Sequence, residues 1–377
     1  MSTSSFHHLL KGLVVCFCFS LAVQLKAGNS VAVENTNPGT SLWRLTNPAS
    51  MSDPLNQTAT SYYANAEIQG YASRTSVNQG QSIDFFVRTI NTNSYTFSIF
   101  RLGWYNGLGG RLMLGPVTLT GVVQPMPAAP VLQPAGTGLV ECNWSVSYSL
   151  TIPTNWVSGV YVAKLSLSAP AKESWIIFLV RDDSRNSPIL YQASFATYQA
   201  YNEWGGSSLY TTTGNDANTG PRTGYKVSFN RPFWRDSGAG DFMRYEIGMV
   251  RWLEHQGYDL TYATDLDTHE NPNLLLSHKV FLAVGHAEYW SWNMRANVDV
   301  LSNEDVFFSP NVPIVAEYQI GLAVSQVLHY KPAFRIDNSQ KGESAEVHQR
   351  PSYEMLTKCT QPITHGPYAV SSPRGTP

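Results

Sequence analysis

The sequence predicts an α/β protein whose N-terminal part is all-β. The hydrophobic pattern changes character near residue 180, and the two halves support different architectures. Before that point, short β-branched and aromatic segments such as Ser82–Ile90 and Val160–Leu167 are separated by turn residues. Many short strands bounded by turns indicate a β-sandwich. After it, apolar strands alternate with segments of helical spacing, which indicates a parallel sheet.

Length and composition narrow the class of protein. The chain has 377 residues, enough for about two domains. Hydrophobic residues make up 43% of it, which is enough for packed cores. The formal net charge is -2, so nothing indicates the basic surface of a nucleic-acid-binding protein. We therefore expect a small-molecule partner and no nucleic acid.

The N-terminus has the pattern of a signal peptide. Lys11 precedes the apolar run Gly12–Val23, and Ala27 offers a small residue at a cleavage site. The run has the length of a signal-peptide hydrophobic region and is too short to span a bilayer. We predict a signal peptide over residues 1–27 and a secreted or periplasmic protein, with a retained N-terminal anchor as the alternative.

Segments up to residue 180 are predicted as follows. Residues 28–65 are rich in Asn, Thr, Ser and Pro without a sustained period, and we expect a linker there. Residues 66–180 carry the predicted β-sandwich domain, and the apolar run Trp175–Val180 is its last buried strand. The other predicted strands include Tyr95–Leu102 and Ser145–Ile152.

Residues 187–307 carry the predicted α/β domain. A helix is expected over Asp241–Gln256, with Asp241 as N-cap and Gly257 as its C-terminal cap. The remaining elements are strands at Ile189–Gln192, Tyr258–Ala263 and Lys279–Val284 and helices at Asn271–Ser277 and Trp292–Leu301. Residues 308–377 show no comparable pattern, and a truncated tail is one explanation.

Two segments follow predicted parallel strands and carry polar side chains. His286 and Glu288 come directly after the strand Lys279–Val284, at a spacing that lets both face one cavity. Ligands bind outside the carboxyl ends of such strands, so this pair is a site candidate. The alternative is a helix-capping turn with its polar groups in solvent.

The second segment, Phe195–Tyr210, follows the first strand of the α/β domain and should lie along the same edge. It contains Tyr198, Tyr201, Trp204 and Tyr210. Such aromatic residues also occur as packed core side chains with satisfied hydroxyls.

Three further patterns are less specific. Thr264–Asp267 ends a strand and supplies either site carboxylates or a helix N-cap. Gly238–Gly240 before a helix is either an anion-binding turn or a plain helix entry. No Gly-x-Ser-x-Gly elbow is present, and neither Cys142 nor Cys359 lies in a nucleophile motif, so serine and cysteine hydrolase chemistry is disfavoured.

An ordered set of motifs resembles the family named after the C-terminal part of the N,N-dimethylformamidase β subunit. The resemblance covers residues 66 to 300, and its order and spacing are specific although no single motif is. The motifs are Ile68–Ser73, Phe100–Gly110, Leu139–Trp144, Pro153–Tyr161, Thr197–Gly206, Ser228–Pro232, Gly238–Asp241, Trp252–Asp259, Thr264–Asp267 and Val284–Trp290.

This resemblance implies a fold and a chemistry. The expected fold is an immunoglobulin-like β-sandwich followed by a parallel-sheet domain of the glutamine-amidotransferase type. In dimethylformamidase itself, the resemblance implies a mononuclear iron held by two Tyr and one Glu, with a His nearby, and hydrolysis of dimethylformamide to formate and dimethylamine. Dimethylformamidase also has a small partner subunit, which this chain would then share.

Matching the motifs assigns roles to individual residues. Tyr201 corresponds to the second tyrosine of the family's Tyr-x-Ala-Tyr motif, and Glu288 and His286 to its His-x-Glu-Tyr motif. The resemblance thus implies Tyr201 and Glu288 as metal ligands and His286 as the catalytic acid or base. Tyr210 is the best match for the second ligand tyrosine, and Tyr225 is the alternative. The substrate pocket is expected to be formed by Tyr198, Trp204, Tyr289 and Trp290.

Phenolate and carboxylate groups fit this assignment because they are hard oxygen donors, better suited to ferric iron than to zinc. The leading hypothesis is therefore a secreted, iron-dependent hydrolase of a small amide. Two alternatives stay open: a non-catalytic secreted protein that binds a ligand or a surface, and a hydrolase of other bonds on the same scaffold.

Overall fold

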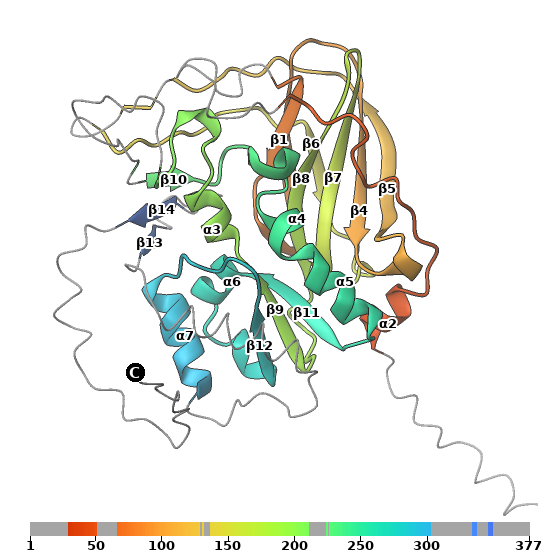
Figure 1. Cartoon of the computed structure of the whole chain (residues 1–377), viewed down its shortest axis with the longest axis vertical. Helices are drawn as coiled ribbons and strands as arrows, with labels where there is room; N and C mark the ends of the chain where they lie inside the picture. The colour runs from red at the N-terminus through yellow and green to blue at the C-terminus, as the bar shows by residue number, and fades with distance from the viewer. Residues whose placement is uncertain are drawn as a thin grey trace, which may run out of the picture.

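The computed structural model of the chain is a mixed α/β protein with several sheets (Figure 1). It describes residues 29–50, 66–128, 130–131, 136–210, 224, 226–302, 334–337 and 346–349. The predicted signal peptide over 1–27 and the alternative ligand Tyr225 lie outside these residues. The structure confirms the α/β class and the change from strands alone to alternating strands and helices.

Two sheets in the N-terminal half share one core. Phe85 lies on a strand of the smaller sheet, and its ring packs edge-on against Phe97 and Phe178 of the larger sheet, at 5.1 and 5.3 Å between centroids. The two sheets therefore pack face to face. The smaller sheet has the order β1-β3-β6 and the larger β2-β8-β7-β4-β5. Their strands are β1 (Ile68–Ala72), β2 (Ser76–Asn78), β3 (Ser82–Thr89), β4 (Tyr95–Leu102), β5 (Gly110–Leu119), β6 (Tyr148–Thr151), β7 (Gly159–Ser168) and β8 (Ala171–Arg181).

A three-stranded parallel sheet forms the centre of the second half. Its order is β11-β9-β12, so β9 lies between the other two strands. The strands are β9 (Ile189–Ala193), β11 (Leu260–Thr264) and β12 (Val280–Ala283), and the α-helices are α3 (Phe195–Ala200), α4 (Phe242–Tyr245), α5 (Ile247–His255), α6 (Asp265–Glu270) and α7 (Trp292–Ser302). The parallel pairing predicted from the alternation is confirmed. Within the described residues, no helix has both the length and the apolar character to cross a membrane.

Shorter elements complete the described chain. Residues of the predicted tail form β13 (Phe334–Asp337) and β14 (Glu346–Gln349), and β14 pairs with β10 (Lys226–Ser228) in an antiparallel sheet. The short 3-10 helices are η2 (Tyr105–Gly107), η3 (Trp204–Gly206), η4 (Arg235–Gly238) and η5 (Leu275–Ser277).

Two predicted helix boundaries differ in the structure. The helix expected over Asp241–Gln256 is divided into α4 and α5 at Glu246, whose backbone is not helical and whose side chain is fully buried. Gly257 ends α5 with a φ of +72°, as its position predicted. Only Leu275–Ser277 of the expected helix Asn271–Ser277 is helical.

The motif Thr264–Asp267 forms a helix N-terminus. The Thr264 hydroxyl accepts from the Asp267 backbone N–H, and the Asp267 carboxylate accepts from the Thr264 backbone N–H, which is a capping box. The helix-cap interpretation of this motif is therefore the correct one, and Asp267 contributes to the start of α6.

The segment expected to be a linker contains a short docked helix, α2 (Ser30–Glu34). Asn29 caps it by accepting from the N–H groups of Val31 and Ala32. Val31 is fully buried in the main hydrophobic core, and α2 lies beside α5 (Figure 1). Composition alone did not show this helix because isolated contacts fix its position: Val31 lies in the core, and the buried Glu34 carboxylate accepts from Tyr105 and Arg111.

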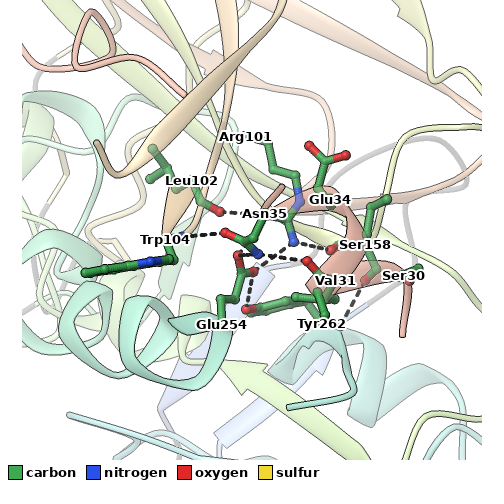
Figure 2. Close-up of polar contacts among 12 residues, drawn as sticks. Ser30, Val31, Glu34, Asn35, Arg101, Leu102, Trp104, Ser158, Glu254 and Tyr262 are labelled. Atoms are coloured by element: carbon green, nitrogen blue, oxygen red, sulfur yellow. Dashed lines mark hydrogen bonds and ion pairs between the residues drawn. The ribbon is translucent and has the colours of Figure 1, made fainter. Parts of the chain in front are cut away.

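A buried ion pair joins the strand layers to the α/β half (Figure 2). Arg101 on β4 donates to both carboxylate oxygens of Glu254 on α5, at 3.0 and 2.8 Å, and neither side chain is exposed to solvent. Asn35 and Tyr262 also donate to Glu254, and the Ser158 carbonyl accepts from Arg101. Partners from three parts of the chain thus surround the two charges, and of the guanidinium nitrogens only Nε has no partner among the described residues.

Two glycines make room for this pair. A Cβ on Gly103 would lie 2.1 Å from the Glu254 carboxylate, and one on Gly159 would lie 2.7 Å from the Arg101 guanidinium. Larger residues at these positions would push the two charged groups apart.

We predict that Glu254→Gln lowers the free energy of unfolding by about 3–5 kcal/mol, because it leaves the Arg101 guanidinium buried without its counter-charge. Arg244→Gln is the control, since the Arg244 side chain is half exposed and its ion pair with Asp236 is long, at 3.8 Å. The expected cost of this change is below about 1 kcal/mol. Urea denaturation measures both, and equal small losses would contradict a stabilising role for the buried pair.

Candidate metal centre

The first site segment leaves the central strand of the parallel sheet. After β9 the chain enters α3, and Tyr201 ends that helix, its N–H donating to the carbonyl of Thr197. The chain then turns back through η3, where Gly205 has a φ of +79° that favours glycine. This turn returns the chain to Tyr210, whose ring stacks on that of Tyr201 at 4.2 Å between centroids.

The second site segment leaves the neighbouring strand β12. Gly285 has a φ of +74°, and a Cβ there would lie 2.8 Å from the Cβ of Tyr245. Glycine is therefore required at the turn that carries the chain to His286 and Glu288. The Thr197 hydroxyl accepts from the backbone N–H groups of Glu288 and Tyr289 at 3.0 and 3.1 Å. Helix α3 thus holds the second segment directly against the first.

Four of the predicted site residues meet at the Glu288 carboxylate. The Tyr201 hydroxyl lies 2.5 Å from Oε2 and the Tyr210 hydroxyl 3.0 Å from Oε1. His286 Nε2 lies 2.9 Å from Oε2. We call Tyr201, Tyr210, His286 and Glu288 the phenol–carboxylate cluster. The expectation that the two segments converge at one edge of the sheet is confirmed; the role of these residues as metal ligands stays a prediction.

The cluster is half-buried and opens toward solvent through its histidine. The Glu288 side chain is 12% exposed and that of His286 33%. Burial, followed by the hydrogen bond to Glu288, raises the pKa of the Tyr201 phenol above its ordinary value. Burial, followed by the hydrogen bond to Tyr201, raises the pKa of Tyr210. Both phenols are therefore protonated at neutral pH and donate to the carboxylate.

The four residues expected to line a substrate pocket lie in different places. The ring of Tyr289 packs edge-on against both phenols of the cluster, at 6.3 and 6.0 Å. Trp290 packs against Phe281 instead. Tyr198 is buried and donates to Glu246, and Trp204 is fully buried in a separate core cluster that includes Trp144. Of the four, the structure brings Tyr289 into contact with the cluster.

Sequence reasoning gave no role to Arg231, which fixes the turn between the two phenols. Arg231 is buried and donates to the carbonyls of Asn202, Trp204 and Ser207, all in the turn from Tyr201 to Tyr210. The one sequence signal for this residue was its place in the motif Ser228–Pro232, and the structure shows why it needs partners: its charged side chain is buried. Arg235 also contributes, with its guanidinium 5.5 Å from the Tyr201 ring.

Glu246, at the break between α4 and α5, is a second carboxyl that the sequence did not reveal. It is fully buried and accepts from the hydroxyls of Tyr191, at 2.9 Å, and Tyr198. Burial raises its pKa to about 7, although the hydrogen bonds from Tyr198 and Tyr191 oppose the shift. This carboxyl therefore titrates near neutral pH beneath the α3 helix that carries Tyr201.

The chain matches the model of one known protein family. The model of the family described as N,N-dimethylformamidase beta subunit-like, C-terminal, matches residues 96–308. This match covers more than half of the chain and includes the whole phenol–carboxylate cluster. The chain belongs to the N,N-dimethylformamidase beta subunit-like C-terminal family.

Individual relatives are more distant. The N,N-dimethylformamidase beta subunit of an Alcaligenes species is 25% identical over 198 residues, which is 43% of this chain and 25% of that protein. The chain thus spans about a quarter of the length of this curated relative. A crystal structure of murine CEACAM1b aligns with 31% of this chain and 54% of its own at 14% identity, with a TM-score of 0.16.

Among the described residues, no group of three or more His, Cys, Asp or Glu side chains is arranged to hold a metal ion.

The titration of Glu246 predicts a pH dependence of stability. Its folded pKa of about 7 exceeds the ordinary value of 4.5. Its contribution to stability is therefore full below about pH 4.5 and declines as the pH rises through 7. We expect a loss of up to about 3 kcal/mol over this range in the wild-type protein.

In Glu246→Gln this component should vanish, because the amide cannot ionise. The measurement is urea denaturation from pH 5 to pH 8, taking the difference between wild type and variant so that other titrating groups cancel. A difference that stays constant across the range would contradict the assignment.

Proposed function

We propose that this chain is a secreted, iron-dependent hydrolase of a small linear amide. One observation carries the proposal: a single carboxylate, Glu288, receives two phenol hydroxyls and an imidazole nitrogen at the carboxyl ends of parallel strands. Open α/β sheets bind their ligands at such ends. Membership of the dimethylformamidase-like family supports the same class of reaction.

The side chains of the cluster fit a hard metal ion. Tyr201, Tyr210 and Glu288 offer three side chains whose donor atoms are all oxygen, and both phenol oxygens already lie within hydrogen-bond distance of the Glu288 carboxylate. Hard oxygen donors suit ferric iron. The two phenols are protonated when they donate to Glu288, so binding an ion would require their protons to leave. Metal uptake should therefore be favoured by higher pH.

Bound in this cluster, iron would polarise an amide carbonyl or lower the pKa of a water molecule. The remaining roles fall to this chain's own side chains. The His286 side chain is more open to solvent than that of Glu288, and its Nε2 faces the Glu288 carboxylate. It is therefore suited to take a proton from water and return it to the amide nitrogen. Hydrolysis then consumes one water and yields a carboxylic acid and an amine as the C–N bond breaks.

Neighbouring residues set the shape of the site. The edge of Tyr289 against both phenols limits the space beside the carboxylate. Tyr245 packs edge-on against the His286 ring at 5.9 Å and so restricts its orientation. Such apolar walls favour a small substrate with alkyl groups on its nitrogen.

We also propose the type of each domain, the export of the chain and a partner subunit. Two facing sheets with a shared core support an immunoglobulin-like sandwich over residues 66–180. The parallel sheet with its flanking helices supports a glutamine-amidotransferase-like domain over residues 187–307. The apolar run Gly12–Val23 supports export. The curated relative is a β subunit, which supports a small partner subunit for this chain as well.

We predict that Glu288→Ala reduces bound iron from about one per chain to near zero while the protein stays folded, because the carboxylate links the other donors. Glu67→Ala is the matched control: its carboxylate accepts from Ser50 in the strand layers, away from the cluster. Elemental analysis gives the iron content, and hydrolysis of dimethylformamide and related small amides is followed by amine release.

Colour gives an independent readout of the phenols. Ferric protein should absorb visible light through phenolate-to-metal charge transfer, and Tyr201→Phe should weaken that band. Tyr258→Phe is the control, since Tyr258 packs against Trp252 instead. Wild-type protein without iron and without amide hydrolysis would favour a non-catalytic ligand-binding protein. Iron with no amide turnover would favour a hydrolase of other bonds.

A further inference from the structure

A cavity of about 320 Å³ lies between the strand layers and the α/β half, apart from the phenol–carboxylate cluster. Residues 70–76, which include the start of β2, form one wall, and α3 forms another. None of the four cluster residues lines it. Its size is in the range of cavities that hold small organic ligands.

Gln199 on α3 presents an unused hydrogen-bond donor at this cavity. Its side chain is 1% exposed and lines the cavity wall. Its amide oxygen accepts from Asn202 Nδ2 at 3.0 Å and from Arg231 Nε at 3.3 Å. Two donors facing one atom identify that atom as the oxygen. No other described residue accepts a hydrogen bond from the amide nitrogen, which is therefore able to donate to a ligand or a water in the cavity.

Arg74 supplies a positive charge at the mouth of the same cavity. Its side chain is exposed and makes no ion pair or hydrogen bond with any other described residue. Arg181 and Arg231 also line the cavity, but their guanidinium groups are committed to Asp183, Asp267 and backbone carbonyls. The cation available to a ligand from the described wall is therefore Arg74.

The acidic groups of the wall are already engaged. Asp267 accepts from Ser76 and Arg181 through one oxygen and from Thr264 through the other. Glu270 interacts electrostatically with Arg181. An occupant therefore meets donors, from Gln199 and Arg74, more readily than acceptors.

The apolar part of the lining includes three phenylalanine residues, Phe195, Phe229 and Phe233. We propose that this cavity is a second ligand site, which binds a small organic carboxylate with an aromatic or aliphatic body. The carboxylate would accept from the Gln199 amide and pair with Arg74, and the apolar body would pack against the phenylalanine rings. Charge-assisted hydrogen bonds of this type are stronger than neutral ones.

The position of this site connects it to the cluster. Gln199 and Thr197 lie on the same short helix, and Thr197 holds the backbone of Glu288 and Tyr289. An occupant that contacts Gln199 therefore touches the helix that positions the phenol–carboxylate cluster.

Isothermal titration of the full chain with sodium benzoate tests the proposal, with benzyl alcohol as the neutral probe of similar size. Gln199→Glu is the sharpest variant because it keeps an oxygen for Arg231 and Asn202 but replaces the free donor by a negative oxygen. We expect one benzoate per chain, little binding of benzyl alcohol, and at least a tenfold loss of affinity in Gln199→Glu.

Further variants separate this site from others. Arg74→Gln should weaken benzoate binding several-fold, whereas Arg44→Gln, an exposed arginine beside Trp43 on the strand layers, should leave it unchanged. Glu288→Gln should also leave it unchanged, which excludes binding at the cluster.

Circular dichroism checks folding, and Arg74→Gln carries the test if Gln199→Glu fails to fold. The proposal is overturned if millimolar benzoate gives no binding heat, if Arg74→Gln and a folded Gln199→Glu both bind as wild type, or if Glu288→Gln abolishes binding.

Discussion

The buried contact between Arg101 and Glu254 ties the whole described structure together. Arg101 belongs to the strand layers and Glu254 to α5, and Asn35 joins them from the N-terminal segment (Figure 2). Tyr262 on β11 donates to the same carboxylate. Because β11 pairs with β9, and β9 with β12, this ion pair holds one edge of the sheet whose strand ends carry the phenol–carboxylate cluster. This contact and the hydrophobic core that both halves share hold the sheet against the strand layers, with the cavity between them.

Glu254, Glu246 and Glu288 of the α/β half each receive a tyrosine hydroxyl, and their surroundings give them different uses. Glu254 is neutralised by Arg101 and is fully buried, as expected of a structural group. Glu246 is buried with Tyr191 and Tyr198, and burial raises its pKa to about 7. Glu288 alone of the three lies beside an imidazole and is partly open to solvent. Hydrogen bonds from tyrosine to glutamate thus belong to the fold at Glu254 and Glu246, and to the candidate site at Glu288. The site differs from the other two in its access to solvent and in the neighbouring imidazole.

The sequence predicted the site better than its surroundings because local hydrophobic pattern places the site residues, whereas long-range contacts place their neighbours. Tyr201, His286 and Glu288 follow strands that local hydrophobic pattern reveals, and parallel pairing then places the strand ends together. The break at Glu246 could not be predicted, since a helical apolar period runs through it and only long-range bonds from Tyr191 and Tyr198 bury its side chain. The docking of α2 depends on buried Val31 and on the ion pair of buried Glu34 with Arg111, and such isolated contacts in a polar segment carry no periodic signal.

The most direct test of this account is anomalous diffraction at the iron absorption edge from crystals of the iron-loaded protein. We expect one strong peak at the cluster, about 2 Å from the Tyr201 and Tyr210 hydroxyl oxygens and from the Glu288 carboxylate, the usual length of bonds from oxygen to a small hard cation. His286 should face that peak without displacing the oxygen donors. A map with no peak at the cluster, or with its iron bound elsewhere in the chain, would contradict the assignment of Tyr201, Tyr210 and Glu288 as a metal centre.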